Sequence, residues 1–105
     1  MGIELIELNY TKAMQQSKDL EKIAKNIKKL SNEELVHIMK NIKKNWKGEN
    51  SENYVEKLET LQENILKTAE NLSSVATTID TIATNTYQAE LRALAAAQER
   101  TYMQQ

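Results

Sequence analysis

At 105 residues and 12.0 kDa, the chain is long enough for one small domain. It contains no Pro, no Cys and no Phe, which excludes a disulfide framework, a thiolate metal site and a cysteine nucleophile. One histidine, His37, and two aspartates, Asp19 and Asp80, leave little for acid–base or metal chemistry, so we expect no enzymatic activity, no metal and no cofactor.

The net charge of −1 is unevenly distributed along the chain. Residues 1–48 carry ten lysines against six acids, whereas residues 49–105 carry four basic residues against nine acids. A basic segment binds nucleic acid or a membrane surface in some proteins, but a basic helix packed on an acidic one explains the same pattern. The N-terminus lacks the positive region and apolar run of a secretory signal peptide, and no apolar stretch approaches the ~18 residues of a membrane span.

The first predicted helix covers about residues 10–45. Apolar residues recur there mostly in steps of three and four, as they do on one face of a helix. This stripe comprises Leu20, Ile23, Ala24, Ile27, Leu30, Leu35, Ile38, Ile42 and Trp46. Residues 1–8, MGIELIEL, are compatible with either a frayed helical turn or an extended arm.

One step in this stripe is five residues long, from Leu30 to Leu35. Within it, Ser31 and Glu34 have the spacing of a capping box, so a kink could restart the helix there. Ser31 can equally be a small stripe residue inside one continuous helix. With no Pro or Gly nearby, we favour continuity.

The second predicted helix covers residues 51–100, a length of ~75 Å at 1.5 Å per residue. Asn50 or Ser51 can cap its N-terminus, where Glu49 and Glu52 suit the positive end of the helix dipole. Its apolar stripe proceeds in steps of three and four only: Tyr54, Leu58, Leu61, Ile65, Ala69, Leu72, Ala76, Ile79, Ala83, Tyr87, Leu91 and Leu94. A helix of this length needs a packing partner.

Between the helices, residues 46–50 form the predicted turn. We expect Gly48 to supply the positive-φ C-cap that ends the first helix. We expect Trp46 to cover the tip of the hairpin with its large apolar surface. Residues 101–105 are left as a tail.

These elements predict an all-α fold, an antiparallel two-helix hairpin whose second helix is longer than the first. Reflection about Gly48 places Tyr10 opposite residue 86, so residues beyond about 88 have no partner in the first helix. The N-terminal arm, a second copy or another protein could cover them. Because two helices bury little core, pairing with a second hairpin would complete a four-helix bundle. The predicted partner interface comprises Leu58, Leu61, Ile65, Leu72, Ile79, Leu91 and Leu94.

The Trp46-Lys47-Gly48 turn near the middle of a Cys-free, two-helix chain of about 100 residues resembles the WXG family of small type VII secretion proteins. Tyr54 stands where that family often has an aromatic residue one turn into the second helix. The resemblance implies an antiparallel four-helix dimer in a Gram-positive bacterium and no enzymatic activity. It also implies export from the cytoplasm without a cleavable signal peptide, through a type VII system and its ATPase.

The family commonly ends its second helix with a secretion motif of an aromatic residue, three intervening residues and an acid. Here Tyr87 is followed by an acid, Glu90, one residue too early. Tyr87 and Glu90 are therefore the candidate export signal in a variant form. Alternatively, the mismatch marks a divergent branch whose members act as targeting factors for LXG toxins, and the partner is then the toxin's N-terminal helical domain.

Two classes of function follow. The first is a non-enzymatic type VII secretion substrate or targeting factor that pairs with another helical hairpin, either a second copy or a secreted toxin's N-terminal domain. The second is a cytosolic homodimeric coiled-coil adaptor with no role in secretion. The lysine clusters lack interleaved aromatic residues, so we expect no nucleic-acid partner, and we expect no small-molecule substrate.

Overall fold

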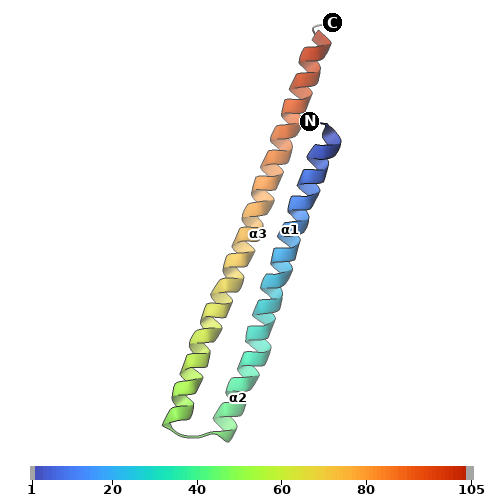
Figure 1. Cartoon of the computed structure of the whole chain (residues 1–105). Coiled ribbons are helices and arrows are strands. Elements are labelled where there is room, and N and C mark those ends of the chain that lie inside the picture. Colours follow the sequence, from blue (N-terminus) through green and yellow to red (C-terminus); the bar gives the residue numbers. More distant parts are fainter. Residues whose placement is uncertain (1, 104–105) are drawn as a thin grey trace. The chain divides into compact units, whose positions relative to one another are not determined.

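The computed structural model describes residues 2–103, and every regular element in that range is helical (Figure 1). The first arm of the chain consists of α1 (Ile3–Lys29), a π-helical turn η1 (Leu30–Leu35) and α2 (Val36–Asn45), which follow one another without interruption. After a short turn, α3 (Glu49–Met103) continues for 55 residues. The predicted all-α class, with the second helix longer than the first, is confirmed.

The chain divides into two compact units, each containing a segment of both arms. Unit 1 consists of Met1–Asp19 and Val75–Gln105, and unit 2 consists of Leu20–Ser74. Within each unit, the segment of the first arm and the segment of α3 run antiparallel. The prediction that residues 1–105 form one domain stays a prediction.

In unit 1, α1 begins at Ile3, well before the predicted start near residue 10. Ile6 is 3% exposed, and it lines a groove together with Leu94 and Ala97 of α3. The N-terminal segment is therefore a helical turn that covers the end of the apolar stripe. Of the three covers considered for residues beyond about 88, the N-terminal segment is the one found at Leu94; the first helix was predicted too short, because this segment belongs to α1.

Small side chains form the contact between the two arms. They recur at intervals of seven residues and are buried, and we call them the inner row: Ser17, Ala24 and Ser31 in the first arm, with Ala69, Ala76 and Ala83 in α3. Their size lets the helix backbones approach closely. In unit 1 the Ser17 hydroxyl donates a hydrogen bond to the Ala76 carbonyl at 3.0 Å, and in unit 2 the Gln62 amide donates to the Ser31 carbonyl at 3.3 Å.

The π-helical turn absorbs one extra residue in the first arm. Counting from the Ser31–Gln62 contact, the next buried residue of the first arm, Met39, is eight positions away, whereas its counterpart in α3, Val55, is seven. If this segment were purely α-helical, the extra residue would rotate the side chains after Ser31 by about 100° away from α3. The wider π-helical turn compensates for this rotation, so that Met39 again faces α3, as expected of a π-bulge.

The five-residue step from Leu30 to Leu35 is the sequence signature of this turn. Helix continuity is therefore confirmed. The capping box is not formed, because Lys29 and not Ser31 stands at the N-terminal boundary and makes no side-chain cap bond. The Ser31 side chain is 0% exposed, and its hydroxyl has no hydrogen-bond partner within residues 2–103.

Gly48 starts the second helix instead of ending the first. Trp46 is the C-cap of α2, in an extended conformation with φ −130° and ψ 116°, and its N–H donates to the Ile42 carbonyl at 2.9 Å. Gly48 has φ +126°, a value that side-chain-bearing residues rarely adopt. Its carbonyl accepts hydrogen bonds from the Ser51 hydroxyl at 2.7 Å and the Glu52 N–H at 3.2 Å.

The predicted capping roles at this turn were therefore wrong. Gly48 is not the C-cap of the first helix, and neither Asn50 nor Ser51 precedes the second one, since α3 already begins at Glu49. The acidic first turn of Glu49 and Glu52 is confirmed. Across residues 2–103, no helix is long and apolar enough to cross a bilayer.

Candidate partner surface and export signal

The turn motif presents a half-exposed aromatic pair in unit 2. The rings of Trp46 and Tyr54 lie 5.9 Å apart between centroids and are tilted by 48°. Trp46 is 46% exposed and Tyr54 is 49% exposed. Trp46 therefore only partly covers the tip of the hairpin, and about half of its surface is available for a contact outside the unit.

Five half-exposed large apolar side chains of unit 2, apart from Trp46 in the turn, share one kind of position. Each stands immediately before an inward-facing residue of its helix: Ile23 before Ala24, Leu30 before Ser31, Ile38 before Met39, Tyr54 before Val55 and Leu61 before Gln62. In two antiparallel helices that face each other, the position before each inward residue lies on the same side of the pair. These five residues form what we call the apolar side of unit 2.

The opposite side of unit 2 is polar. The positions that follow inward residues carry Lys25, Asn32 and Lys40 on the first arm and Glu56, Glu63 and Glu70 on α3. A groove of about 520 Å³ on this polar side is lined mainly by charged and polar side chains, among them Glu21, Lys28 and Ser73. Ser73 donates a hydrogen bond to the Glu21 carboxylate at 3.3 Å.

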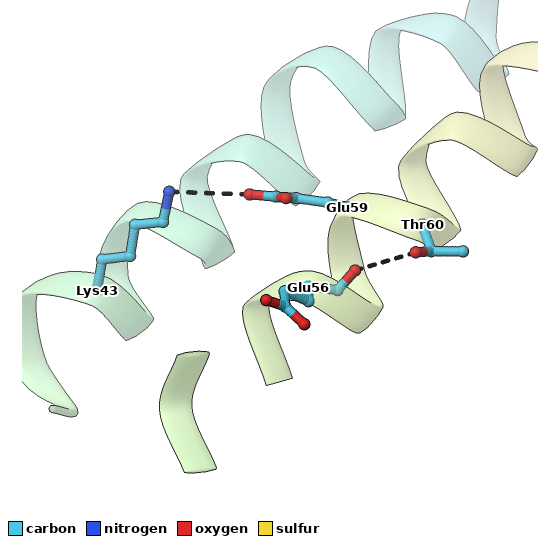
Figure 2. A network of polar contacts seen from close by, with 4 residues as sticks. All are labelled: Lys43, Glu56, Glu59 and Thr60. Atoms are coloured by element: carbon cyan, nitrogen blue, oxygen red, sulfur yellow. Dashed lines mark hydrogen bonds and ion pairs between the residues drawn. The ribbon is translucent and has the colours of Figure 1, made fainter. Parts of the chain in front are cut away.

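The basic first arm therefore does face the acidic part of α3, as the simpler interpretation of the charge pattern required. Figure 2 shows the ion pair between Lys43 of α2 and Glu59 of α3, at 3.9 Å, beside a hydrogen bond from Thr60 to the Glu56 carbonyl. Both charged side chains are more than half exposed. Exposed pairs of this kind contribute about 0–1 kcal/mol, so this ion pair stabilises the contact between the arms only slightly.

Unit 1 contains the candidate export signal. The rings of Tyr87 and Tyr10 lie 4.6 Å apart between centroids, with a 32° tilt. This agrees with the expected position of Tyr10 opposite residue 86. Both tyrosines, with Ile82 and Glu90, line a groove of about 250 Å³. Tyr87 is therefore packed within the unit, and Glu90 lies half-buried beside it.

In unit 1 the position before a buried residue also carries exposed apolar side chains, although Ile3 and Leu8 are exposed at other positions of α1. Val75 precedes the buried Ala76, and Ile82 precedes the buried Ala83. Ile82 is 60% exposed and Val75 is half exposed. Unit 1 thus has an apolar side of its own, to which Leu5, immediately before Ile6, also belongs.

The predicted interface residues are divided between the units, and none is fully buried. Leu58, Leu61, Ile65 and Leu72 belong to unit 2, and Ile79, Leu91 and Leu94 belong to unit 1. Leu61 is 46% exposed, and the other six are half-buried. All seven keep apolar surface that a further partner could cover, and their role in an interface stays a prediction.

The sequence stripe did not separate inward residues from those at its edge. It grouped Ile23, Leu30 and Ile38 with the residues that contact α3, but these three are half exposed, and their neighbours Ala24, Ser31 and Met39 are the buried ones. For Ile23 and Leu30, the signal for the difference was the seven-residue recurrence of Ser and Ala. Where small side chains set the spacing of the helices, the larger neighbour remains beside the contact.

Comparisons with curated proteins and with solved structures find no match for the chain. A family model does match, over residues 5–99, and its description is WXG100, proteins of 100 residues with WXG. The matched range includes both arms and the Trp46-Lys47-Gly48 turn.

Proposed function

The chain belongs to the WXG100 family of small helical type VII secretion proteins, and we propose that it is a secretion substrate or targeting factor that pairs with another helical hairpin. The family is one of non-enzymatic secreted helical proteins, and its members typically form helical-hairpin dimers. The partner in this proposal is a second copy or the N-terminal helical domain of an LXG-type toxin. In this proposal, the type VII ATPase recognises the resulting pair of hairpins.

The observation that carries the pairing is the one-sided distribution of apolar side chains. In unit 2, Ile23, Leu30, Ile38, Tyr54 and Leu61 share one side, while lysines and glutamates occupy the other. Covering the exposed half of each aliphatic side chain contributes about 1 kcal/mol. A continuous apolar side of this kind on a monomer marks a protein interaction surface, and a second hairpin has the matching shape.

For export, we propose that Tyr87 and Glu90 act together as a variant of the family's secretion motif. The two residues share the inward half of α3 and line one groove. Because Tyr87 packs on Tyr10, the recognised feature would be the packed tyrosine pair with its adjacent carboxylate, not a free tyrosine ring.

The test is secretion from the host with the type VII ATPase present and absent. Replacing both Tyr87 and Glu90 by Ala should remove the protein from the culture medium while the purified variant stays helical by circular dichroism. Gln88→Ala, an exposed change between them, is the matched control and should be secreted normally. Unchanged secretion of the double variant would overturn the signal, and a wild type that never leaves the cell would favour the cytosolic adaptor.

A further inference from the structure

Two grooves of unit 1 adjoin each other at Ile6 and Glu90. One, of about 250 Å³, lies between α1 and α3 and is lined largely by Ile, Ala and Tyr side chains. The other, of about 290 Å³, continues toward the C-terminus along Ala93, Leu94 and Ala97. Together with the exposed Ile82, they form an apolar trough with one carboxylate near its middle.

That carboxylate is incompletely satisfied. The Glu90 Oε2 atom is buried and has no hydrogen-bond partner among residues 2–103. Four basic residues belong to unit 1, and none of them lines either groove: Lys12, Lys18, Arg92 and Arg100. A buried carboxylate oxygen without a donor is unfavourable, and the rest of the side chain is still partly hydrated.

We propose that this trough docks a partner helix whose apolar stripe carries a single lysine or arginine facing Glu90. The inference rests on the proposed pairing function and specifies the chemistry of the partner. A docked helix removes the remaining water from the carboxylate. If the helix is apolar at that point, the charge is left without compensation; if it brings an ammonium or guanidinium group, a charge-assisted hydrogen bond forms.

Glu90 is thus a specificity-determining residue. The surrounding Ile and Ala side chains attract any apolar helix, and the carboxylate disfavours those that lack a donor. Selection against the wrong partner by an unpaired charge is a common device in helix pairing. It would let this chain distinguish one hairpin from other apolar hairpins in the same cell.

The test uses the full-length chain and two stapled helical peptides of about 20 residues, or ~30 Å. The peptides are identical, with apolar residues in steps of three and four, except that one central apolar position is lysine in the first and norleucine in the second. Fluorescence anisotropy measures the dissociation constant of each. Wild type should bind the lysine peptide about tenfold more tightly or better.

Three variants complete the design. Glu90→Leu should reverse the preference, and the nearly isosteric Glu90→Gln should reduce it to about threefold or less, since the amide keeps hydrogen bonding without charge. Glu99→Gln changes an exposed carboxyl on the same helix and should leave the preference intact. Circular dichroism melting establishes that each variant is folded.

Equal affinity of wild type for both peptides, or the same preference in Glu90→Leu, would overturn the selectivity. Absence of binding by either peptide would overturn the trough as a helix site. Neither result touches pairing through unit 2, which Leu61→Ser tests separately by loss of assembly. Loss of peptide discrimination with intact pairing therefore rejects this inference alone.

Discussion

The two units have the same kind of contact between their helices but differ in what surrounds it. In both, Ser and Ala at seven-residue intervals face the opposite helix. Around that contact, unit 2 places complementary charges on its polar side and five large apolar side chains on the other. Unit 1 instead places a tyrosine pair and an incompletely satisfied carboxylate in its trough.

In the proposed pairing, this difference suits the two units to different roles, adhesion for unit 2 and partner discrimination for unit 1. Unit 2 has few specific features on its apolar side, which suits adhesion to any matching helix pair. Unit 1 carries a half-buried carboxylate that an apolar partner cannot compensate, which suits discrimination. Both units have the same kind of helix contact, so equivalent substitutions in the inner row should destabilise them equally. Substitutions outside the inner row should affect only the unit that contains them.

Among single substitutions, the largest expected effect comes from overpacking of the inner row. Ala69→Leu in unit 2 and Ala83→Leu in unit 1 should each lower the free energy of unfolding by about 1–3 kcal/mol, because neither helix can move away without breaking its other contacts. Chemical denaturation monitored by circular dichroism measures the loss. Thr68→Leu, an exposed change beside Ala69, should cost less than ~0.5 kcal/mol; a similar loss there would contradict close packing of the inner row.

Gly48→Ala should destabilise unit 2 by about 1–2 kcal/mol. The cause is the φ of +126° alone, since an added Cβ would meet no atom within 4 Å. Thermal melting measures it, with Lys47→Ala as the adjacent control. If residue 48 could change to a negative φ without an energetic cost, the Gly48→Ala and Lys47→Ala variants would have the same melting temperature.

Deletion of Asn32 should leave the stability unchanged or raise it by up to ~1 kcal/mol. One residue fewer lets the π-helical turn become α-helical while Met39 and Ile42 keep facing α3. Deletion of the exposed Glu63, on α3 where no such turn exists, should unfold unit 2. Equal damage from both deletions would show that η1 does not absorb an extra residue.

The smallest effect should come from Lys43→Ala. Its ion pair with Glu59 is exposed, so the expected change in the free energy of unfolding is within about 0.5 kcal/mol and disappears at high salt. Denaturation at low and high ionic strength measures it. A loss well above 1 kcal/mol would mean that the arm-to-arm charges stabilise unit 2 substantially.

Periodicity alone predicted the helices and their order, because an apolar repeat of three and four has only one regular solution at this length. It also predicted that Tyr10 lies opposite about residue 86, one position from its observed contact Tyr87, since a short turn fixes the antiparallel register. It did not assign the caps, because a Gly beside a turn can end one helix or begin the next, and the choice depends on φ.

Sequence reasoning also missed the division between inner and edge residues. Ile23 and Ala24 fit the same stripe, and hydrophobicity favours the larger residue for burial, whereas the spacing of the helices admits only the smaller. The five-residue step at Leu30 indicated an irregularity but did not specify a π turn over a kink. The unpaired state of the Glu90 carboxylate depends on which side chains from both arms line its groove, and a single helix pattern does not contain that information.

In the proposed function, the apolar side of unit 2, and not its polar side, pairs with another hairpin. The oligomeric state of two matched double variants of unit 2 tests this pairing. It is measured by light scattering of size-fractionated protein isolated from the host. Ile38→Ser with Leu61→Ser changes the apolar side, and Lys40→Ser with Glu63→Ser changes the polar side. We expect the assembly formed by wild type to persist in the polar-side variant and to be lost in the apolar-side variant. Loss of assembly in the polar-side variant alone would overturn pairing through the apolar side.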